Sequence, residues 1–284
     1  MASRSQDVTT MPVGGLPLHI LGLSTLPPSP APIQVVFFAH GRLNTAAASL
    51  SICQDIYSYL PPSTLMVTFD QRNHGHRIIH SLANESWQKG NDNHAIDMWA
   101  IQYGTARDVS YLMDVLPAFL GRDVEAWGMC GVSLGGHATL LALANDSRLQ
   151  TGVSIIGCGD YLTLMTHRSQ KSTPQIPLPP ASEKYINAQL LSALHAHDPI
   201  HRAHAFRDKA LLLLNGGSDK LVPASCNEKF IGKLGAVMDP ERFQVVVEDG
   251  VKHAVTETMK ERCGQWLARW ITTGEKDNGT KSRI

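Results

Sequence analysis

The sequence predicts an α/β fold with a mostly parallel central sheet and helices on both faces. Apolar runs rich in β-branched and aromatic residues recur along the chain, as in strands that are buried on both faces. Helical patterns lie between several of these runs, so we expect right-handed crossovers between parallel strands. The chain has 284 residues, of which 43% are hydrophobic, enough for one large α/β domain. We therefore expect a single domain over residues 1–284.

The expected elements follow in chain order. Residues 8–24 indicate two short strands around Gly14 and Gly15, which is a hairpin signal. Parallel strands are expected at residues 33–39, 65–69, 124–130, 151–156, 210–214 and 243–247. The clearest helical spacing is that of Val109, Leu112, Met113, Leu116 and Phe119. Thr105 and Asp108 resemble a capping box, which would begin this helix.

Two stretches interrupt the alternation of strands and helices. Residues 76–103 are polar, with Trp87 and Trp99 among them. Residues 161–206 are rich in proline, at positions Pro174, Pro177, Pro179 and Pro180. Both stretches are longer than ordinary connections in an α/β domain. We expect functional insertions, and we expect residues 161–206 to form a lid or cap.

Charge and composition argue against several classes of function. The 25 basic and 25 acidic residues balance, whereas nucleic-acid and polybasic membrane binders carry a basic excess. The five cysteines form no C-x-x-C pair and are poor material for a disulfide framework. No secretory signal and no run of roughly 18 apolar residues is visible. We expect a cytoplasmic protein without a membrane span or nucleic-acid partner; a homodimer is left open.

A serine in a sharp turn is the candidate nucleophile. Gly131-Val-Ser133-Leu-Gly135 follows the expected strand at 124–130 and precedes a helical stretch at 137–145. This is G-x-S-x-G in its strand–turn–helix context, where the glycines remove side chains that would collide with neighbouring elements. The pattern predicts that Ser133 is a catalytic nucleophile. A tight structural turn is the alternative.

A serine nucleophile needs a base and a group that orients the base. On this kind of scaffold they follow in the order serine, acid, histidine. Asp219 comes after the expected strand at 210–214, and His253 comes after the one at 243–247, before a last amphipathic helix. Both would lie at the same sheet edge as Ser133. Asp160, after the strand at 151–156, is the alternative acid.

Most histidines must have other roles. His74, His76 and His80 come too early in the chain for the usual order. The densest cluster is His195, His197, His201 and His204, whose spacing would allow a metal site, although no cysteine or clear glutamate accompanies it. We favour polar positions in the lid for this cluster, and we expect neither a metal nor a cofactor. Asp198 before Pro199 fits a helix N-cap.

An oxyanion hole requires backbone N–H donors aimed at the developing negative charge. One donor is expected from Leu134, directly after the nucleophile. The other should come from the loop after the first parallel strand, where His40-Gly41 begins a turn and Arg42 follows. We therefore expect the backbone N–H groups of Arg42 and Leu134 to form the hole. The guanidinium of Arg42 is left to reach either the substrate or a surface acid.

Jointly, these motifs resemble the α/β-hydrolase superfamily of serine hydrolases, over about residues 33–270. They are His40-Gly41, Phe69-Asp-Gln-Arg-Asn-His-Gly75, Gly131-Val-Ser-Leu-Gly135, Gly217-Ser-Asp219 with Val222-Pro223, and His253. The second of them is similar to the D-x-R-x-H-G turn of esterase and peptidase-like branches, which implies that Asp70 and Arg72 brace a loop beside the site. Residues 91–98 and 104–108 are similar to uncharacterised fungal members. Serine at the nucleophile position disfavours the dehalogenases, epoxide hydrolases and dienelactone hydrolases of this fold.

The chain is therefore expected to be a serine esterase that cleaves carboxylic esters, or thioesters, of small organic molecules through an acyl-enzyme. Ser133 would attack, His253 would act as general base, and Asp219 would orient it. Zero net charge fits a weakly charged substrate. One alternative is a thioesterase or acyltransferase of a biosynthetic pathway, which would share all of these residues. Another is a non-catalytic small-molecule-binding protein on the same fold, which would not need an intact triad.

Overall fold

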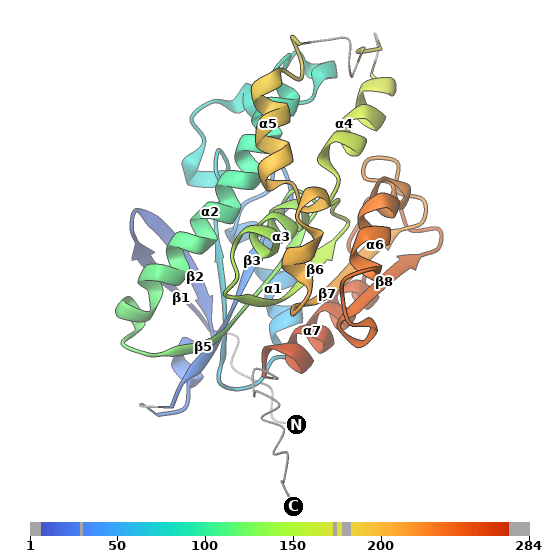
Figure 1. The fold of residues 1–284 in the computed structure, drawn as a ribbon. Helices are drawn as coiled ribbons and strands as arrows, with labels where there is room; N and C mark the ends of the chain where they lie inside the picture. Colours follow the sequence, from blue (N-terminus) through green and yellow to red (C-terminus); the bar gives the residue numbers. More distant parts are fainter. Residues whose placement is uncertain (1–6, 29–30, 173–174, 178–182, 273–284) are drawn as a thin grey trace, which may run out of the picture.

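The computed structural model of the chain describes residues 7–28, 31–172, 175–177 and 183–272. Within these residues, eight strands form one sheet in the order β1-β2-β4-β3-β5-β6-β7-β8 (Figure 1). The strands are Val8–Val13 (β1), Leu16–Leu21 (β2), Ile33–Ala39 (β3), Thr64–Phe69 (β4), Val124–Val132 (β5), Leu149–Ile155 (β6), Ala210–Gly216 (β7) and Phe243–Glu248 (β8). β1 and β2 form the expected hairpin, and β2 is antiparallel to β4. All other neighbours are parallel, which confirms the predicted sheet.

Helices cover both faces of the sheet. The α-helices of the described residues are Leu50–Tyr57 (α1), His94–Leu120 (α2), Leu134–Asn145 (α3), Tyr161–Gln170 (α4), Ala188–His197 (α5), Glu228–Gly235 (α6) and Glu257–Ile271 (α7). α1 and α7 share one apolar core with the sheet, and α2, α3 and α6 share another. In β3, Val35 and Phe37 belong to the α2 side, whereas Val36 and Phe38 belong to the α7 side. Successive strand side chains point to opposite faces, so one strand serves both cores.

Helix α2 begins well before the expected capping box, so that prediction is wrong. Thr105 is buried within the helix. Asp108 accepts hydrogen bonds from the guanidinium groups of Arg72 and Arg77, both at 2.8 Å. Gly104 leaves room for Arg72, because a Cβ there would lie 2.4 Å from Arg72 Cδ. A carboxylate with tertiary partners of this kind can sit in a helix interior. Residues 94–103 of the expected insertion at 76–103 belong to this helix.

The carboxyl ends of the central strands meet at one edge of the sheet. β3 pairs with β5, β5 with β6, β6 with β7 and β7 with β8 in parallel. Several strands run past the apolar stretches that predict them: β5 ends at Val132 rather than Cys130, and β7 ends at Gly216 rather than Leu214. Because these strands are parallel, the loops after β3, β5, β7 and β8 all leave the sheet at this edge. This is the edge at which open α/β sheets bind ligands.

The stretch 161–206 contains α4, α5 and two short 3-10 helices, Pro199–His201 and Ala203–Phe206. Pro174, Pro179 and Pro180 lie outside the described residues. Both α-helices pack against the N-terminal half of α2 at the top of Figure 1. Trp99 contacts Tyr161 with ring centroids 5.4 Å apart, and Tyr103 stacks on His197 at 4.7 Å. The two interruptions of the α/β alternation therefore pack against each other.

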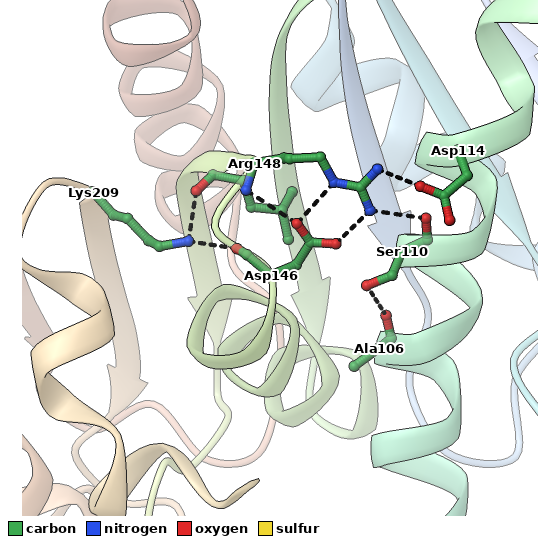
Figure 2. Close-up of polar contacts among 7 residues, drawn as sticks. Ala106, Ser110, Asp114, Asp146, Arg148 and Lys209 are labelled. Atoms are coloured by element: carbon green, nitrogen blue, oxygen red, sulfur yellow. Dashed lines mark hydrogen bonds and ion pairs between the residues drawn. The ribbon is translucent and has the colours of Figure 1, made fainter.

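A polar cluster lies where the chain turns from α3 into β6 (Figure 2). The guanidinium of Arg148 donates to both carboxylate oxygens of Asp146, at 3.0 and 2.7 Å. It also bonds the carboxylate of Asp114 and the carbonyl of Ser110, both on α2. Lys209 donates to two backbone carbonyls of the same turn, at 2.6 and 2.8 Å. The cluster ties the C-terminal end of α3 to α2 and to the start of β7.

The cysteines, the helices and the potential metal ligands of the fold have these properties. All five cysteines are buried and unpaired. Among the described residues, no helix is long and apolar enough to cross a membrane. The same residues hold no group of three or more histidine, cysteine, aspartate or glutamate side chains that could bind a metal ion.

Candidate active site

The turn between β5 and α3 presents Ser133 in a strained conformation, with φ 52° and ψ −108°. A side chain at either flanking glycine would collide with backbone: a Cβ on Gly131 would lie 2.4 Å from the Gly135 oxygen, and one on Gly135 would lie 1.9 Å from that of Ala39. The N–H of Ser133 donates to the carbonyl of Ile155 at 2.8 Å. Packing thus holds a conformation that a serine rarely adopts, which is typical of a functional position.

Ser133, Asp219 and His253 come together at this edge of the sheet. Nε2 of His253 lies 2.9 Å from Oγ of Ser133, and Nδ1 lies 2.7 Å from Oδ2 of Asp219. Both distances are hydrogen-bond lengths. The imidazole therefore connects the hydroxyl and the carboxylate in one chain, with each group on the loop after a different strand.

Asp219 is held from several sides. Its carboxylate is fully buried, and Oδ1 accepts the backbone N–H groups of Leu221 and Val222 at 2.8 and 3.0 Å. The backbone of this loop bonds the loop that carries His253, since the Ser218 N–H donates to the Val251 carbonyl at 2.8 Å. Oδ2 is thereby left to face the imidazole. A buried carboxylate in this position fixes the orientation of the imidazole ring.

Arg42 and Leu134, the two residues whose backbone N–H groups are expected to form the oxyanion hole, line the same cavity as Ser133. Neither backbone N–H group donates a hydrogen bond to any described residue. His40 helps to hold the turn before Arg42: Nε2 accepts the N–H of Gln71 at 3.1 Å, and Nδ1 donates to the carbonyl of Gly41 at 2.8 Å. Burial lowers the pKa of His40 to about 4, so the ring is neutral. Among the described residues, the Arg42 guanidinium bonds no surface acid and donates to the carbonyl of Asn84, at 3.1 Å.

The other candidate acids have structural partners. Asp160 caps α4: its Oδ1 accepts the N–H of Thr163 at 3.0 Å. Asp198 does precede Pro199 at the start of a 3-10 helix, but its carboxylate accepts the N–H of Tyr161 at 3.0 Å instead of capping that helix. The structure brings Asp219, not Asp160, to the imidazole of His253.

The histidine cluster of the expected lid does not converge on one point. The rings of His195 and His201 lie 5.2 Å apart between centroids. His197 stacks on Tyr103, and its Nδ1 lies 3.0 Å from the side-chain oxygen of Asn145. His204 is exposed. These are separate local contacts rather than a ligand set.

The loop after β4 packs beside the site. The carboxylate of Asp70 accepts the N–H groups of Ala46 and His76, both at 2.9 Å. Burial alone would raise the pKa of Asp70, and these hydrogen bonds outweigh it and lower the pKa. Arg72 instead pairs with Asp108 on α2. Asp70 therefore ties this loop to the segment after β3, and Arg72 ties it to α2.

Ser133 opens into a cavity of about 420 Å³. Two residues of its wall were not singled out by the sequence: His137, one turn after Ser133 on α3, and Arg168, near the end of α4. The i, i+4 spacing from Ser133 could have indicated His137, since such residues share a helix face. Arg168 gave no signal, because only the packing of α4 brings it to the cavity.

Comparison with solved structures supports the fold. TT1662 from Thermus thermophilus aligns with a TM-score of 0.69 at 21% identity, over 94% of this chain and 99% of that one. The Pyrococcus furiosus esterase Pf2001 aligns with a TM-score of 0.59 at 18% identity, over 95% and 94%. A puromycin-hydrolyzing peptidase of Mycobacterium tuberculosis aligns with a TM-score of 0.64 at 14% identity, over 96% of this chain but 40% of the peptidase.

Sequence comparison places the chain in a family. A Bacillus subtilis protein named "Putative esterase YitV" is 26% identical over 147 residues. That match spans 51% of this chain and 57% of the relative, little more than half of the relative's length. The resemblance to fungal members stays a prediction. The profile of the prolyl oligopeptidase family matches residues 104–273, more than half of the chain and the part that carries Ser133, Asp219 and His253. Together with its fold, this match shows that the chain is an α/β-hydrolase of the prolyl oligopeptidase family.

Proposed function

We propose that the chain is a serine hydrolase that cleaves carboxylic esters of small organic molecules. The observation that carries the proposal is the hydrogen-bonded chain from Ser133 through His253 to Asp219, with distances of 2.9 and 2.7 Å. The backbone N–H groups of Arg42 and Leu134, which bond no described residue, support it, because both residues line the cavity of Ser133. In this proposal the chain is a single domain, and residues 161–206 form a cap that shapes the cavity.

Acylation would begin when Oγ of Ser133 bonds the substrate carbonyl carbon while its proton moves to Nε2 of His253. The carbonyl electron pair moves to oxygen, and the N–H groups of Arg42 and Leu134 donate to this oxyanion. Each such donor is worth roughly 2.7–4 kcal/mol in the transition state. The imidazolium, stabilised by Asp219, then gives its proton to the departing alcohol as the C–O bond breaks.

Deacylation would repeat these steps with water as the nucleophile. His253 takes a proton from water, and the hydroxide bonds the acyl carbon. The tetrahedral intermediate then collapses: its bond to Oγ breaks, and Ser133 recovers its proton from the imidazolium. The products are a carboxylic acid and the starting enzyme. No step needs a group that the chain does not supply.

Peptide or amide hydrolysis is the second candidate, because the family match is to the prolyl oligopeptidase family. The same residues would act, with an amine as the leaving group. The ester reading is supported by the archaeal esterase whose length the chain matches almost completely. The chain covers only 40% of the mycobacterial peptidase.

A fluorophosphonate probe tests the nucleophile. Wild-type protein should be labelled, and Ser133→Ala should not. Ser218→Ala is the matched control, because Ser218 is an exposed serine beside Asp219 and should not affect labelling. If folded wild-type protein stays unlabelled, the proposal fails and a non-catalytic binding protein becomes the better reading.

A pair of chromogenic substrates separates the two candidate activities. p-Nitrophenyl butyrate and p-nitrobutyranilide carry the same acyl group and differ in the scissile bond. We expect hydrolysis of the ester and no detectable hydrolysis of the anilide. Comparable rate enhancements over the uncatalysed reactions would favour a peptidase or amidase instead.

A further inference from the structure

A second cavity adjoins the one that holds Ser133. It has a volume of about 130 Å³, and Arg42, Arg168 and Leu221 line both cavities. Its other walls come from the segment around Trp87 and from the C-terminal end of α4. A substrate with its carbonyl at Ser133 could therefore extend a side arm into this second cavity.

The charges around the second cavity are unbalanced. Four cationic residues line it, the half-buried Arg42 and Arg168 and the exposed Lys171 and Lys220, and no aspartate or glutamate is among its described lining residues. Neither lysine forms an ion pair with a described residue. In a chain whose formal charge is zero, four cations without an acid at one cavity mark a local excess of positive charge.

Arg168 is the most unusual of the four. Its Nε is buried and has no hydrogen-bond partner among the described residues. Burial, together with the charge of Arg42, lowers the pKa of Arg168 to about 10, so the guanidinium is still charged at neutral pH. The residue as a whole is half-buried, and withdrawing a cation from water without a carboxylate partner is costly. Two acids beside the start of α4 are engaged elsewhere: Asp160 bonds Thr163, and Asp198 bonds Tyr161.

Arg42 also lacks a carboxylate partner. Burial lowers its pKa, and the charge of Glu85 acts in the opposite direction. The Glu85 carboxylate, however, pairs with Lys89 at 3.1 Å. The guanidinium of Arg42 bonds only the carbonyl of Asn84 among the described residues. Arg42, which lines both cavities, is therefore a second cation with N–H donors that no described residue uses.

His137 adds a neutral donor in the first cavity. The N–H of Cys158 lies 2.8 Å from Nδ1 of His137. The carbonyl of Cys158 also lies near this nitrogen, at 3.0 Å. Because the contact with the N–H is the shorter one and an N–H can only donate, we assign Nδ1 as the acceptor and the ring proton to Nε2. Burial, followed by the charge of Arg168, lowers the pKa of His137 to about 3, which keeps the ring neutral. Nε2 is buried without a hydrogen-bond partner in the described structure, and its N–H is a second unused donor close to Arg168.

We propose that Arg168, with Arg42 and the Nε2–H of His137, forms a binding site for a carboxylate group of the substrate, so that this hydrolase acts on esters that carry a free carboxylate. The inference rests on the proposed function and names its substrate class. A carboxylate suits the site because its two oxygens accept two hydrogen bonds from a guanidinium and a further one from an imidazole. It contrasts with the weakly charged substrate that zero net charge suggests.

Monomethyl adipate and dimethyl adipate test the proposal. Both have the same chain and the same scissile methyl ester, and they differ only in the charge at the far end. Because hydrogen bonds between charged groups are the stronger ones, we expect wild-type kcat/KM for the monoester to exceed that for the diester by at least about 10-fold, measured as methanol release. A diester that is cleaved as well as the monoester would overturn the inference and leave the proposed esterase function standing.

Arg168→Gln should reduce this preference about 10-fold, mainly through a higher KM for the monoester. Arg168→Lys should retain part of it, because it keeps the charge without the planar fork of donors. Arg207→Gln is the matched control, since Arg207 is exposed and lines neither cavity. An unchanged preference in Arg168→Gln would contradict the assignment of this residue.

Binding to Ser133→Ala separates this inference from the proposed function, because it needs no turnover. By titration calorimetry, monomethyl adipate should bind more tightly than dimethyl adipate, and the difference should disappear when Arg168→Gln is added. Tighter binding of the monoester would support the carboxylate site even if neither ester is hydrolysed. Equal binding of both compounds would overturn it, whatever the result of fluorophosphonate labelling.

Discussion

The arginines near the two ends of helix α3 differ in whether they have a carboxylate partner. At the C-terminal end, Arg148 bonds Asp146, Asp114 and the carbonyl of Ser110 (Figure 2). These hydrogen bonds, led by those of Asp146, raise the pKa of Arg148. Burial alone would raise the pKa of Asp146, but its hydrogen bonds with Arg148 lower it to about 2. Each charge at this end stabilises the other.

At the N-terminal end, Arg168 lines the cavity that begins at Ser133 and has no carboxylate partner among the described residues. The helix dipole adds to this difference. It favours a cation at the C-terminal end of α3, near Arg148, and an anion at the N-terminal end, near Arg168. A paired cation at one end contributes to stability, whereas an unpaired one at the other costs stability and leaves its donors available to a ligand. The difference separates a structural charge from a functional one.

The largest expected effect comes from the catalytic end. His253→Ala should lower kcat/KM for p-nitrophenyl butyrate by about 10³-fold or more, because serine loses its general base. The melting temperature should change little, since the side chain is partly exposed. His204→Ala, which changes an exposed histidine, is the control. Retained activity in His253→Ala would return the role of base to another histidine.

Lowering the pH should destabilise the region around Ser133 before it destabilises the cluster around Arg148. Burial lowers the pKa of His40 to about 4 and those of His94 and His137 to about 3. The unfolded chain binds these protons near pH 6.5 and the folded chain does not. The free energy of unfolding should therefore decrease as the pH is lowered from about 6.5 to about 4. Burial raises the pKa of Asp198, which opposes this by one proton. These four groups give a slope of at most about 3 kcal/mol per pH unit. Burial also lowers the pKa values of His74, His197 and His201, which act in the same direction.

Urea unfolding at pH 7, 5.5 and 4.5 measures this slope. Hydrogen exchange under the same conditions locates the loss, which should appear around α2 and the start of α3. The Arg148 cluster should stay intact, because the pKa of Asp146 is about 2. A free energy of unfolding that is constant over this range would show that the buried histidines do not resist protonation.

Arg148→Gln should destabilise the protein by about 2 kcal/mol and leave activity near the wild-type level. The substitution removes hydrogen bonds between charged groups and leaves Asp146 without its main partner. Because the Arg148 side chain is 41% exposed, solvent moderates the loss. Urea unfolding of this variant and of Arg207→Gln gives the comparison. A loss of activity without a loss of stability would contradict the proposal that the Arg148 cluster is structural and that only the Ser133 end of α3 serves activity.

Arg168→Met should have the smallest effect on stability, and one of opposite sign. We expect a gain of about 1 kcal/mol in the free energy of unfolding, because an apolar side chain of similar length replaces a half-buried cation that has no carboxylate partner among the described residues. Thermal unfolding at neutral pH measures it. A destabilisation comparable to that of Arg148→Gln would mean that Arg168 has a structural partner and is not held for a ligand.

Local patterns predicted the sheet and the position of the turn at Ser133. The strands β3 to β8 are rich in apolar residues, and Gly131 and Gly135 flank a serine between a strand and a helix. The start of α2 was not predictable in the same way. Thr105 and Asp108 have the spacing of a capping box, yet Asp108 serves two arginines from the loop after β4. A capping pattern does not reveal whether its side chains have partners distant in the sequence.

By itself, the sequence determined the order of strands and helices, the strained turn, and the candidates Ser133, Asp219 and His253, because each depends on neighbouring residues or on strand ends. Only the tertiary structure decided which acid faces the imidazole and which charges lack partners. Asp160 and Asp219 both follow strands, but Asp160 is used by α4. Arg148 and Arg168 look alike as residues, and their difference arises from which carboxylates lie near them once α2, α3 and α4 have packed. Hydrogen bonds and desolvation act over a few ångströms in space, so residues far apart in the chain decide them.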